Sequence, residues 1–357
     1  MVETSHGPAV DFSSNDYLGL ASDRRLADAS AAAANEHGAG AGGSRLISGN
    51  NPEHERLEGE VAAFVDAERA LTFSSGYAAN VGIIPALVSR DDVIFADALN
   101  HASLIDGCRL SRAVVHVYPH ADAAALEALL ASHRGQFRRA MIVTDGVFSM
   151  DGDRAPLPDL VGLARRFDAW TYVDDAHAVG VLGDQGRGTP SAFGLHGAID
   201  VTIGTFGKSF GVSGAFVYGS ATLCQFLLNR ARSFVFSTAV PPAQAAACRA
   251  GIRIASEEPW RRDLVLGNAR LLRAQLATLG VNVLGEPDAH ILPIPVGDTE
   301  RTVAIGRELA ANGFLVGAVR PPTVPDGGSR LRITVSAAHT REQLSDLANA
   351  LTRVVAQ

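Results

Sequence analysis

The sequence predicts an α/β protein with a mostly parallel sheet and helices on both of its faces. Short, almost wholly apolar segments such as AMIVTD and TYVDDAH alternate with helical segments such as DAAALEALLASH. Apolar strands of this kind are typical of a parallel sheet that is buried on both sides. Hydrophobic residues make up 47% of the chain and charged residues 19%, a composition typical of a compact enzyme that excludes a disordered chain.

The length of 357 residues predicts two domains, since a single core rarely exceeds about 250 to 300 residues. We expect an N-terminal arm over residues 1–40, a large domain over 41–240 and a smaller α+β domain over 241–357. The double proline Pro241-Pro242 marks the break, and the arm is expected to pack with the small domain. The elements expected in the small domain are the helices NARLLRAQLATLG and ERTVAIGRELAANG and the strands HILPIPVG, FLVGAV and SRLRITVS.

The N-terminal arm leads into an alanine-rich helix that we expect to end at Gly38. The glycine-rich segment Gly38–Arg45 follows, and its composition fits either a cradle for an anion or a mobile loop. Residues 53–65 have the period of an amphipathic helix.

A turn after the next predicted strand is a candidate phosphate site. The strand ends in Ser74-Ser75-Gly76, and a helix follows. Free N–H groups and the positive end of the helix dipole favour an anion there, so Gly76 and Tyr77 are the candidate donors. The alternative is that serine and glycine serve only the geometry of the turn.

The charge and the cysteines exclude several classes of protein. The net charge is −7, and no basic cluster is longer than two arginines, which argues against a nucleic-acid partner. Cys108, Cys224 and Cys248 lie far apart without metal-ligand spacing, so we expect reduced, mostly buried thiols, no metal site and a cytoplasmic location. We expect no signal peptide and, without an apolar stretch of about 18 residues, no membrane span.

Lys208 is the only lysine in the sequence, since the other 30 of the 31 cationic residues are arginines. A lysine amine can form a Schiff base, whereas an arginine stays protonated and cannot. The leading hypothesis is therefore a covalent imine between Lys208 and an aldehyde cofactor, pyridoxal 5′-phosphate (PLP). The alternative is a lysine retained by chance.

PLP needs further partners that the sequence can supply. Its ring nitrogen needs a carboxylate, and Asp174 at a predicted strand end is the candidate, although a helix-capping Asp is the ordinary alternative. His177 is a candidate for the phenolic oxygen and His101 for stacking on the ring; either is otherwise a structural histidine. The Thr205 hydroxyl is a candidate donor to the phosphate. These groups follow strands whose carboxyl ends share one edge of the sheet, so we expect them to converge.

A P-loop is the rival interpretation of Gly207-Lys208-Ser209. That motif requires a glycine five residues before Gly207, and Thr202 stands there instead. The sequence therefore argues against a nucleotide site.

The combined motifs resemble the α-oxoamine synthases, a group of fold-type-I PLP enzymes. The resemblance implies a large domain with a mostly parallel seven-stranded sheet, a smaller C-terminal domain and a homodimer in which Ser237 and Thr238 reach the partner's phosphate site. The motifs cover about residues 13 to 340, namely SSNDYLGL, GSRLISG, FSSGYAAN, NHASLIDG, DGVFSMDGD, VDDAHAVGVLGDQGRG, TFGKSFGVSGA, STAVPPAQ, RPPTVP and RLRITVSAAH.

The resemblance also implies a reaction. Arg320 and the residues after it are similar to the biotin-pathway members, which condense L-alanine with a pimeloyl thioester, on CoA or a carrier protein, and release CO₂. Arg332, with Asn15 and Ser149, is expected to bind the alanine carboxylate, since a planar guanidinium can bind it by two parallel hydrogen bonds. Family members usually carry a further N-terminal helix with basic residues for the acyl substrate. We expect either that this start is missing from the sequence or that acyl recognition falls to other groups such as Arg320.

Three readings stay open at this point. The first is the biotin-pathway reaction, with the use of glycine and a short acyl-CoA as its alternative within the same family. The second is another PLP reaction such as aminotransfer. The third is a binding protein without catalysis.

Overall fold

The computed structural model describes residues 1–5 and 7–355 and divides them into two compact units. Unit 1 comprises Met1–Gly19, Ser149–Asp153 and Trp260–Gln357, and unit 2 comprises Leu20–Phe148 and Arg154–Pro259. The domain boundaries expected near residues 40 and 240 stay predictions. Each unit has its own sheet and its own hydrophobic core.

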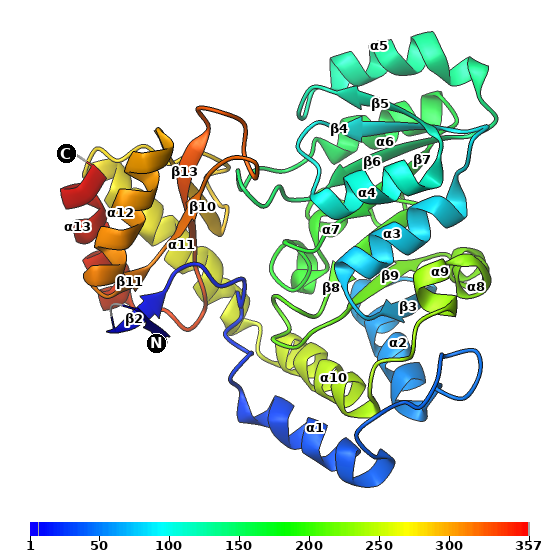
Figure 1. The fold of residues 1–357 in the computed structure, drawn as a ribbon, viewed down its shortest axis with the longest axis horizontal. Coiled ribbons are helices and arrows are strands. Elements are labelled where there is room, and N and C mark those ends of the chain that lie inside the picture. Colours follow the sequence, from blue (N-terminus) through cyan, green and yellow to red (C-terminus); the bar gives the residue numbers. More distant parts are fainter. Residues whose placement is uncertain (6, 356–357) are drawn as a thin grey trace. The chain divides into compact units, whose positions relative to one another are not determined.

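Unit 2 is built on a seven-stranded sheet in the order β3-β9-β8-β7-β6-β4-β5 (Figure 1). Only β9 runs opposite to the other strands, as its antiparallel pairing with both β8 and β3 shows. This sheet confirms the predicted fold class. The strands are β3 (Arg69–Phe73), β4 (Val93–Asp97), β5 (Val114–Tyr118), β6 (Ala140–Asp145), β7 (Trp170–Asp174), β8 (Val201–Thr205) and β9 (Ala215–Gly219).

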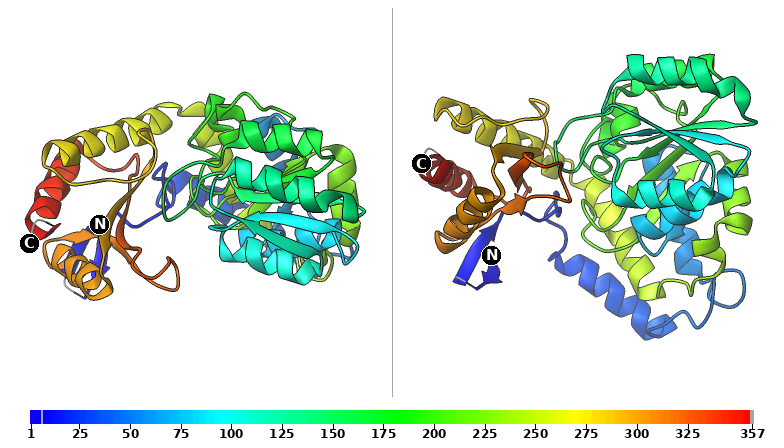
Figure 2. Two further views of the ribbon diagram at one scale, coloured as in Figure 1. Left: turned by 90° about the horizontal axis from the view of Figure 1, so that it is seen from above. Right: turned by 45° about the horizontal axis from the view of Figure 1, so that its top comes forward.

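Both faces of this sheet are covered by helices, as Figures 1 and 2 show. Successive side chains of a strand point to opposite faces, so β4 sends Ile94 to one core and Phe95 to the other. Helices α3 and α4 pack on the first core, and α5 and α6 on the second. The helices of unit 2 are α1 (Arg24–His37), α2 (Pro52–Val65), α3 (Gly76–Leu87), α4 (Ala102–Ser111), α5 (Ala123–His133), α6 (Leu157–Arg166), α7 (Thr189–Ala192), α8 (Ala221–Arg230), α9 (Arg232–Val235) and α10 (Pro242–Glu257).

The local signals place several helix ends correctly. Helix α1 ends at Gly38, whose φ of 83° is a conformation that glycine adopts without strain. The sequence favours a helix over the whole segment LPDLVGLARRFDAW, but α6 ends at Arg166. Asp168 adopts a φ of 49° and ends the helical conformation, and Trp170 instead begins β7 opposite Met141.

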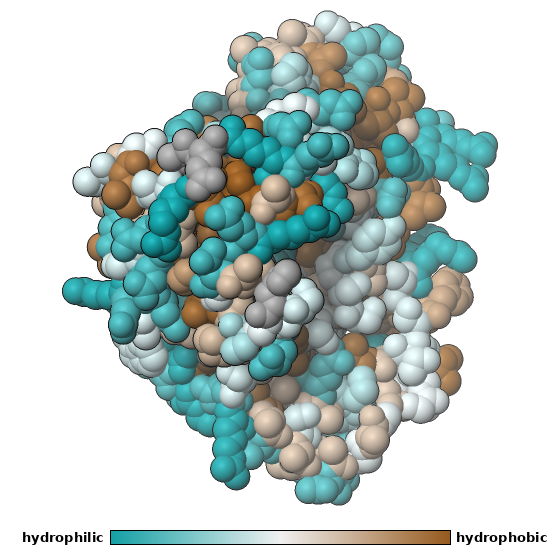
Figure 3. All heavy atoms as spheres, turned by 60° about the vertical axis from the view of Figure 1, so that its left-hand side comes forward, coloured by the Kyte–Doolittle hydropathy of each residue, from teal (hydrophilic) through white to brown (hydrophobic). Residues whose placement is uncertain are grey.

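Unit 1 combines two three-stranded sheets with three helices, which agrees with an α+β arrangement. Both chain ends contribute to unit 1, since Thr334 N donates to Phe12 O at 2.8 Å. The side chain of Phe12 lies in the same hydrophobic core as Leu331, Ile333, Leu347 and Leu351. The face of this unit that Figure 3 shows carries hydrophilic side chains between apolar ones, a mixture that is typical of amphipathic helices. Its elements are β1 (Val2–Thr4), β2 (Gly7–Asp11), β10 (Ile291–Gly297), β11 (Phe314–Leu315), β12 (Gly317–Val319), β13 (Ser329–Thr334), α11 (Trp260–Thr278), α12 (Thr299–Ala311) and α13 (Arg341–Val355).

Candidate active site

The carboxyl edge of the seven-stranded sheet gathers most of the predicted site residues. The segments that follow β3, β4, β7 and β8 carry Gly76, His101, His177 and Lys208, and Asp174 is the last residue of β7. Parallel strands end at a common edge, which is where ligands bind in open α/β sheets. The expected convergence is therefore present within unit 2.

Lys208 lies on a loop between β8 and β9 that hydrogen bonds close at both ends. Phe206 N and the Thr205 hydroxyl both donate to Gly214 O, at 2.9 and 2.8 Å. Val212 N donates to Phe206 O at 2.9 Å, so the backbone on either side of the lysine is fixed. The Thr205 hydroxyl thus holds this loop, and it would have to rotate to donate to a phosphate. Lys208 is half-buried.

Asp174 is buried and accepts two hydrogen bonds. Asn80 Nδ2 donates to its Oδ2 at 2.6 Å, and Ala176 N donates to its Oδ1 at 3.1 Å. Donors of this kind stabilise the ionised carboxylate. His177, three residues further on, is also buried. A buried anion at this edge fits a cationic pyridine ring.

His101 follows β4 as the N-cap of α4. Its Nδ1 lies 2.7 Å from the hydroxyl of Ser103, which is buried, although His101 as a whole residue is exposed. Desolvation of the imidazole lowers the pKa of His101; Asp174 opposes this effect, and the Lys208 charge adds to it. The imidazole is therefore favoured in its neutral form, which suits stacking beside a cationic ring.

Asp145 is a second buried carboxyl group at this edge. Its Oδ2 accepts the His101 N–H at 2.7 Å. Burial, together with the charge of Asp174, raises the pKa of Asp145 well above its ordinary value. The sequence placed Asp145 at a strand end but assigned it no role.

The N-terminus of α3 has room and donors for a phosphate. The first helical bond of α3 runs from Ala79 N to Ser75 O, and the Ser75 hydroxyl accepts from Ala78 N at 3.0 Å. The N–H groups of Gly76 and Tyr77 precede these bonds, and a helix leaves such groups without an internal acceptor. A Cβ added at Gly76 would meet nothing within 4 Å, so the space beside it is open. This end of the site fits the phosphate of PLP.

Ser237 and Thr238 follow α9 and are held by the glycine-rich loop. Thr238 forms an antiparallel bridge with Ser44, and Ala239 N donates to Gly43 O at 2.9 Å. A Cβ added at Gly49 would lie 1.9 Å from Gly43 O, so only glycine allows the loop to fold back on itself. The segment is thus an ordered loop that supports residues 237–239.

In unit 1, Arg332 forms a second constellation with Asn15 and Ser149. Arg332 Nε donates to Ser149 O at 2.5 Å, and Nη2 donates to Asn15 Oδ1 at 3.0 Å. The guanidinium is buried and its orientation is fixed. Tyr17 donates its hydroxyl to Asn15 Oδ1 at 3.2 Å, and burial raises the pKa of Tyr17 to about 12. Arg320 is exposed directly after β12.

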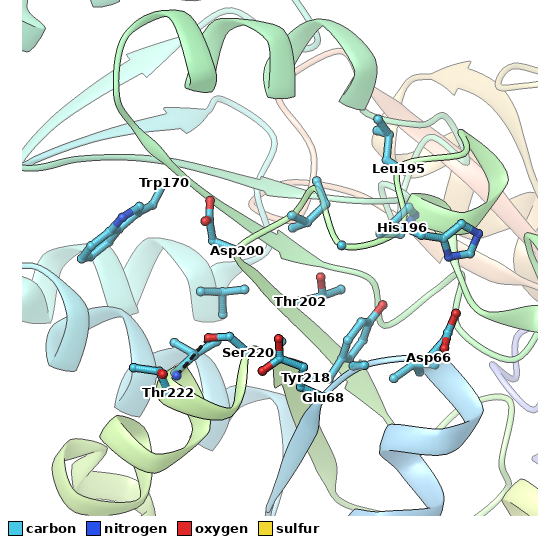
Figure 4. Close-up of a pocket in the computed structure, with 18 of the residues that line it drawn as sticks. Asp66, Glu68, Trp170, Leu195, His196, Asp200, Thr202, Tyr218, Ser220 and Thr222 are labelled. Atoms are coloured by element: carbon cyan, nitrogen blue, oxygen red, sulfur yellow. Dashed lines mark hydrogen bonds between the residues drawn. The ribbon is translucent and has the colours of Figure 1, made fainter.

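Unit 2 also has a cavity of about 540 Å³ (Figure 4). It is lined by the starts of β7 and β8, the end of β9 and the start of α8, which belong to the edge opposite Lys208. Two of its carboxylates accept hydrogen bonds from the backbone: Glu68 accepts from Ala221 N at 2.9 Å, and Asp200 accepts from Thr171 N at 2.8 Å. None of the predicted site residues lines this cavity.

Among residues 1–5 and 7–355, no three His, Cys, Asp or Glu side chains are grouped so that they could hold a metal ion. No helix in the same ranges is long and apolar enough to cross a bilayer.

The sheet, the lysine loop and the carboxylate define a fold-type-I PLP-dependent transferase. A family model described as aminotransferase class I and II matches residues 8–351. Curated proteins called 8-amino-7-oxononanoate synthase are similar over nearly the whole chain. The one from Methylococcus capsulatus is 49% identical over 98% of this chain and 90% of its own length. The protein called 8-amino-7-oxononanoate synthase 2 from Bacillus subtilis is 47% identical over 94% of this chain and 85% of its own length.

Solved structures agree with these relatives. A serine palmitoyltransferase from S. paucimobilis, solved with a bound PLP–myriocin aldimine, superposes with a TM-score of 0.92 at 30% identity, covering 97% of this chain and 87% of that one. The 8-amino-7-oxononanoate synthase of Francisella tularensis has a TM-score of 0.84 at 28% identity and covers 98% of both chains. The chain belongs to the 8-amino-7-oxononanoate synthases, a family of PLP-dependent acyltransferases within the class I and II aminotransferases.

Proposed function

We propose that this enzyme condenses L-alanine with a pimeloyl thioester to form 8-amino-7-oxononanoate, CO₂ and the free thiol carrier, a step of biotin biosynthesis. The observation that carries this proposal is the placement of the only lysine on a fixed loop at the edge where Asp174 is buried. The names of the curated relatives favour this reaction over the use of glycine with a short acyl-CoA.

PLP, when bound, withdraws electrons from the α-carbon of the amino acid. We assign its ring nitrogen to Asp174, its ring face to His101 and its phenolic oxygen to His177. The phosphate is assigned to Gly76 and Tyr77 N–H groups, with Ser149 and Thr205 as further contacts. The donors to Asp174 and the open space at Gly76 support these assignments.

Lys208 and Arg332 are assigned the substrate. The Nζ of Lys208 anchors the cofactor and, once released, accepts the α-proton of alanine. Arg332, held by Asn15 and Ser149, binds the alanine carboxylate, and the fixed direction of its guanidinium supports that role. Arg320 is exposed and offers a charge to the acyl substrate.

We further propose a homodimer in which Ser237 and Thr238 contact the phosphate bound by the partner. Their support by the glycine-rich loop keeps this segment ordered. The proposal includes the length of the acyl chain, which is pimeloyl, and its attachment to a carrier as a thioester.

Two experiments test the function. The loaded protein is reduced with borohydride and digested with a lysine-specific protease, which cuts an unmodified chain only after Lys208. We expect the reduced protein to resist cleavage, whereas cleavage into residues 1–208 and 209–357 would reject the covalent role of Lys208. Release of CoA is then followed with alanine or glycine and with pimeloyl-, succinyl- or acetyl-CoA. Turnover with glycine and a short acyl-CoA that equals or exceeds that with alanine and pimeloyl-CoA would overturn the biotin assignment.

A further inference from the structure

Asn80 is a buried amide on α3 that contacts two parts of the site at once. Its Nδ2 lies 2.6 Å from Asp174 Oδ2 and 2.8 Å from Ser103 Oγ. Helix α4 reaches it because Gly107 has no side chain: a Cβ there would lie 2.8 Å from Asn80 O. The two hydrogens of one amide group therefore bind a strand end and a neighbouring helix.

The orientation of this amide is fixed by a third partner. The buried Tyr172 hydroxyl donates to Asn80 Oδ1 at 2.7 Å. If the amide were flipped, its oxygen would face the Asp174 carboxylate, and Asp174 Oδ2 would lose the hydrogen bond that Asn80 donates. Asn80 must therefore donate to Asp174, which stabilises the ionised form of that carboxyl group.

The second hydrogen of Asn80 fixes the direction of the next bond. Ser103 Oγ accepts from Asn80, so its own hydrogen is free to donate to His101 Nδ1, 2.7 Å away. Ser103 N also points at this nitrogen, at 3.3 Å. Nδ1 of His101 is thus the acceptor, and the neutral ring carries its hydrogen on Nε2.

We propose that Asn80 is a positioning residue that holds the Asp174 carboxylate in place and sets the tautomer of His101 through one directed chain of hydrogen bonds. The charged or titratable groups around this chain are Asp145, which accepts the His101 N–H, and Lys208, whose charge acts on both His101 and Asp145. The benefit to PLP rests on the proposed function. The directions of the hydrogen bonds can be tested in the protein without PLP.

The tautomer is measured in the unloaded protein by NMR with ¹⁵N-labelled histidine, and the His101 signals are assigned with His101→Gln. We expect the Nε2–H tautomer of His101 between about pH 6 and 8, since its pKa is lowered. In Ser103→Ala, Nδ1 loses its hydroxyl donor and keeps only the 3.3 Å contact with the backbone N–H of residue 103, so the tautomers should mix. In Asn80→Asp, the new carboxylate would accept the Ser103 hydrogen and should have the same effect. A hydrogen on Nδ1 in the unmodified protein, or unchanged signals in both variants, would overturn the proposal.

The second readout is the dissociation constant of PLP, measured by titration of its absorbance. Asn80→Asp keeps the shape of the side chain but loses both donors, so we expect PLP to bind at least about 10-fold more weakly, the usual cost of a lost hydrogen bond to a charged group. Binding within about twofold of the unmodified protein would mean that Asn80 only fills space.

Asn268 provides a matched control, because it is also buried and donates from Nδ2 to His339 O at 3.0 Å, but it belongs to unit 1. Asn268→Ala should lower stability and leave both readouts unchanged; a shift of the His101 signals in this variant as large as in Asn80→Asp would count against a specific role. If Asn80→Asp does not fold, Ser103→Ala still decides the tautomer. Failure of the Lys208 labelling with an intact His101 tautomer would reject the function and leave this inference standing.

Discussion

Asp145 and Asp174 stand opposite each other in neighbouring parallel strands, paired in register at the ends of β6 and β7. Both are buried, but their surroundings differ. Asp174 accepts from Asn80 and Ala176, whereas burial and the charge of Asp174 raise the pKa of Asp145. The ionised form is thus disfavoured at Asp145, and Asp174 is the carboxyl group of the pair that has the Asn80 donor.

Replacing the two carboxyl groups by amides should have unequal effects. Asp174→Asn removes the charge proposed to hold the ring nitrogen, so we expect kcat to fall about 10²-fold or more, as for other lost electrostatic contacts of this kind. Asp145→Asn keeps an acceptor for the His101 N–H and removes a carboxyl group whose pKa burial already raises, so its kcat should stay within about fivefold. Rates with alanine and pimeloyl-CoA at saturating PLP measure both. Equal losses in the two variants would contradict the assignment of the charge.

Arg332→Lys should weaken the binding of alanine. A lysine keeps the positive charge but loses the planar pair of donors, so we expect KM for alanine to rise about 10-fold or more. Arg330→Lys is the control, because Arg330 lies on the same strand and pairs with Asp151 instead. An unchanged KM in Arg332→Lys, or the same increase in the control, would rule out a carboxylate-binding role.

Asp175 should make the protein less stable as the pH rises from about 4 to 7. Burial raises the pKa of Asp175 to about 7, against Thr189, which donates its N–H at 2.9 Å and its hydroxyl. An unfolded Asp loses its proton near pH 3.9, so in this window the folded chain binds more protons than the unfolded chain. The free energy of unfolding then falls with pH, by up to about 4 kcal/mol in total.

The test for Asp175 is urea unfolding at pH 5 and pH 8 for the unmodified protein and Asp175→Asn. The amide does not titrate, so the variant's free energy of unfolding should rise relative to that of the unmodified protein between pH 5 and pH 8. A stability difference that is the same at pH 5 and pH 8 would show that Asp175 ionises normally.

The thiols should be unreactive until the protein unfolds. Cys108, Cys224 and Cys248 are free and buried, as the sequence predicted. Burial raises the pKa of Cys108 and of Cys224 to about 12 and also raises that of Cys248, and the thiol form is a poor nucleophile. A chromogenic disulfide reagent should therefore release no colour from the native protein and three equivalents in denaturant. Rapid labelling of the native protein would contradict this burial.

Shared active sites can be tested with two inactive variants. Lys208→Ala removes the amine, and Thr238→Arg places a bulky side chain in the segment proposed to reach the partner. Co-expressed chains should regain about a quarter of full activity, because half of randomly formed dimers are mixed and one of their two sites is intact. Each variant expressed alone is the control. No recovery in mixed dimers that have been isolated by two affinity tags would reject the exchange of residues.

The sequence predicted the parts of the site that depend on local order. Lys208, Asp174 and His101 follow strands, and strand ends in a parallel sheet share an edge whatever the helices do. Asn80 lay within a quoted motif, yet its role was missed, because its contact with Ser103 depends on how closely α3 and α4 pack. The one available signal was a polar residue within the apolar run of α3. The phosphate contact of Thr205 stays a prediction, and the sequence did not show that the return of β9 gives its hydroxyl an acceptor at Gly214.

The pairing of both chain ends in unit 1 has a consequence for biosynthesis. Strand β2 pairs with β11, and Phe12 O accepts from Thr334 N, so the first nineteen residues need the last third of the protein before they can fold. All residues of unit 2 precede Trp260. Because domains fold as units during translation, a ribosome that has reached α12 should carry a finished lysine-bearing sheet and an unstructured leading end. Arg332, the residue proposed to bind the substrate carboxylate, is thus among the last groups to be folded.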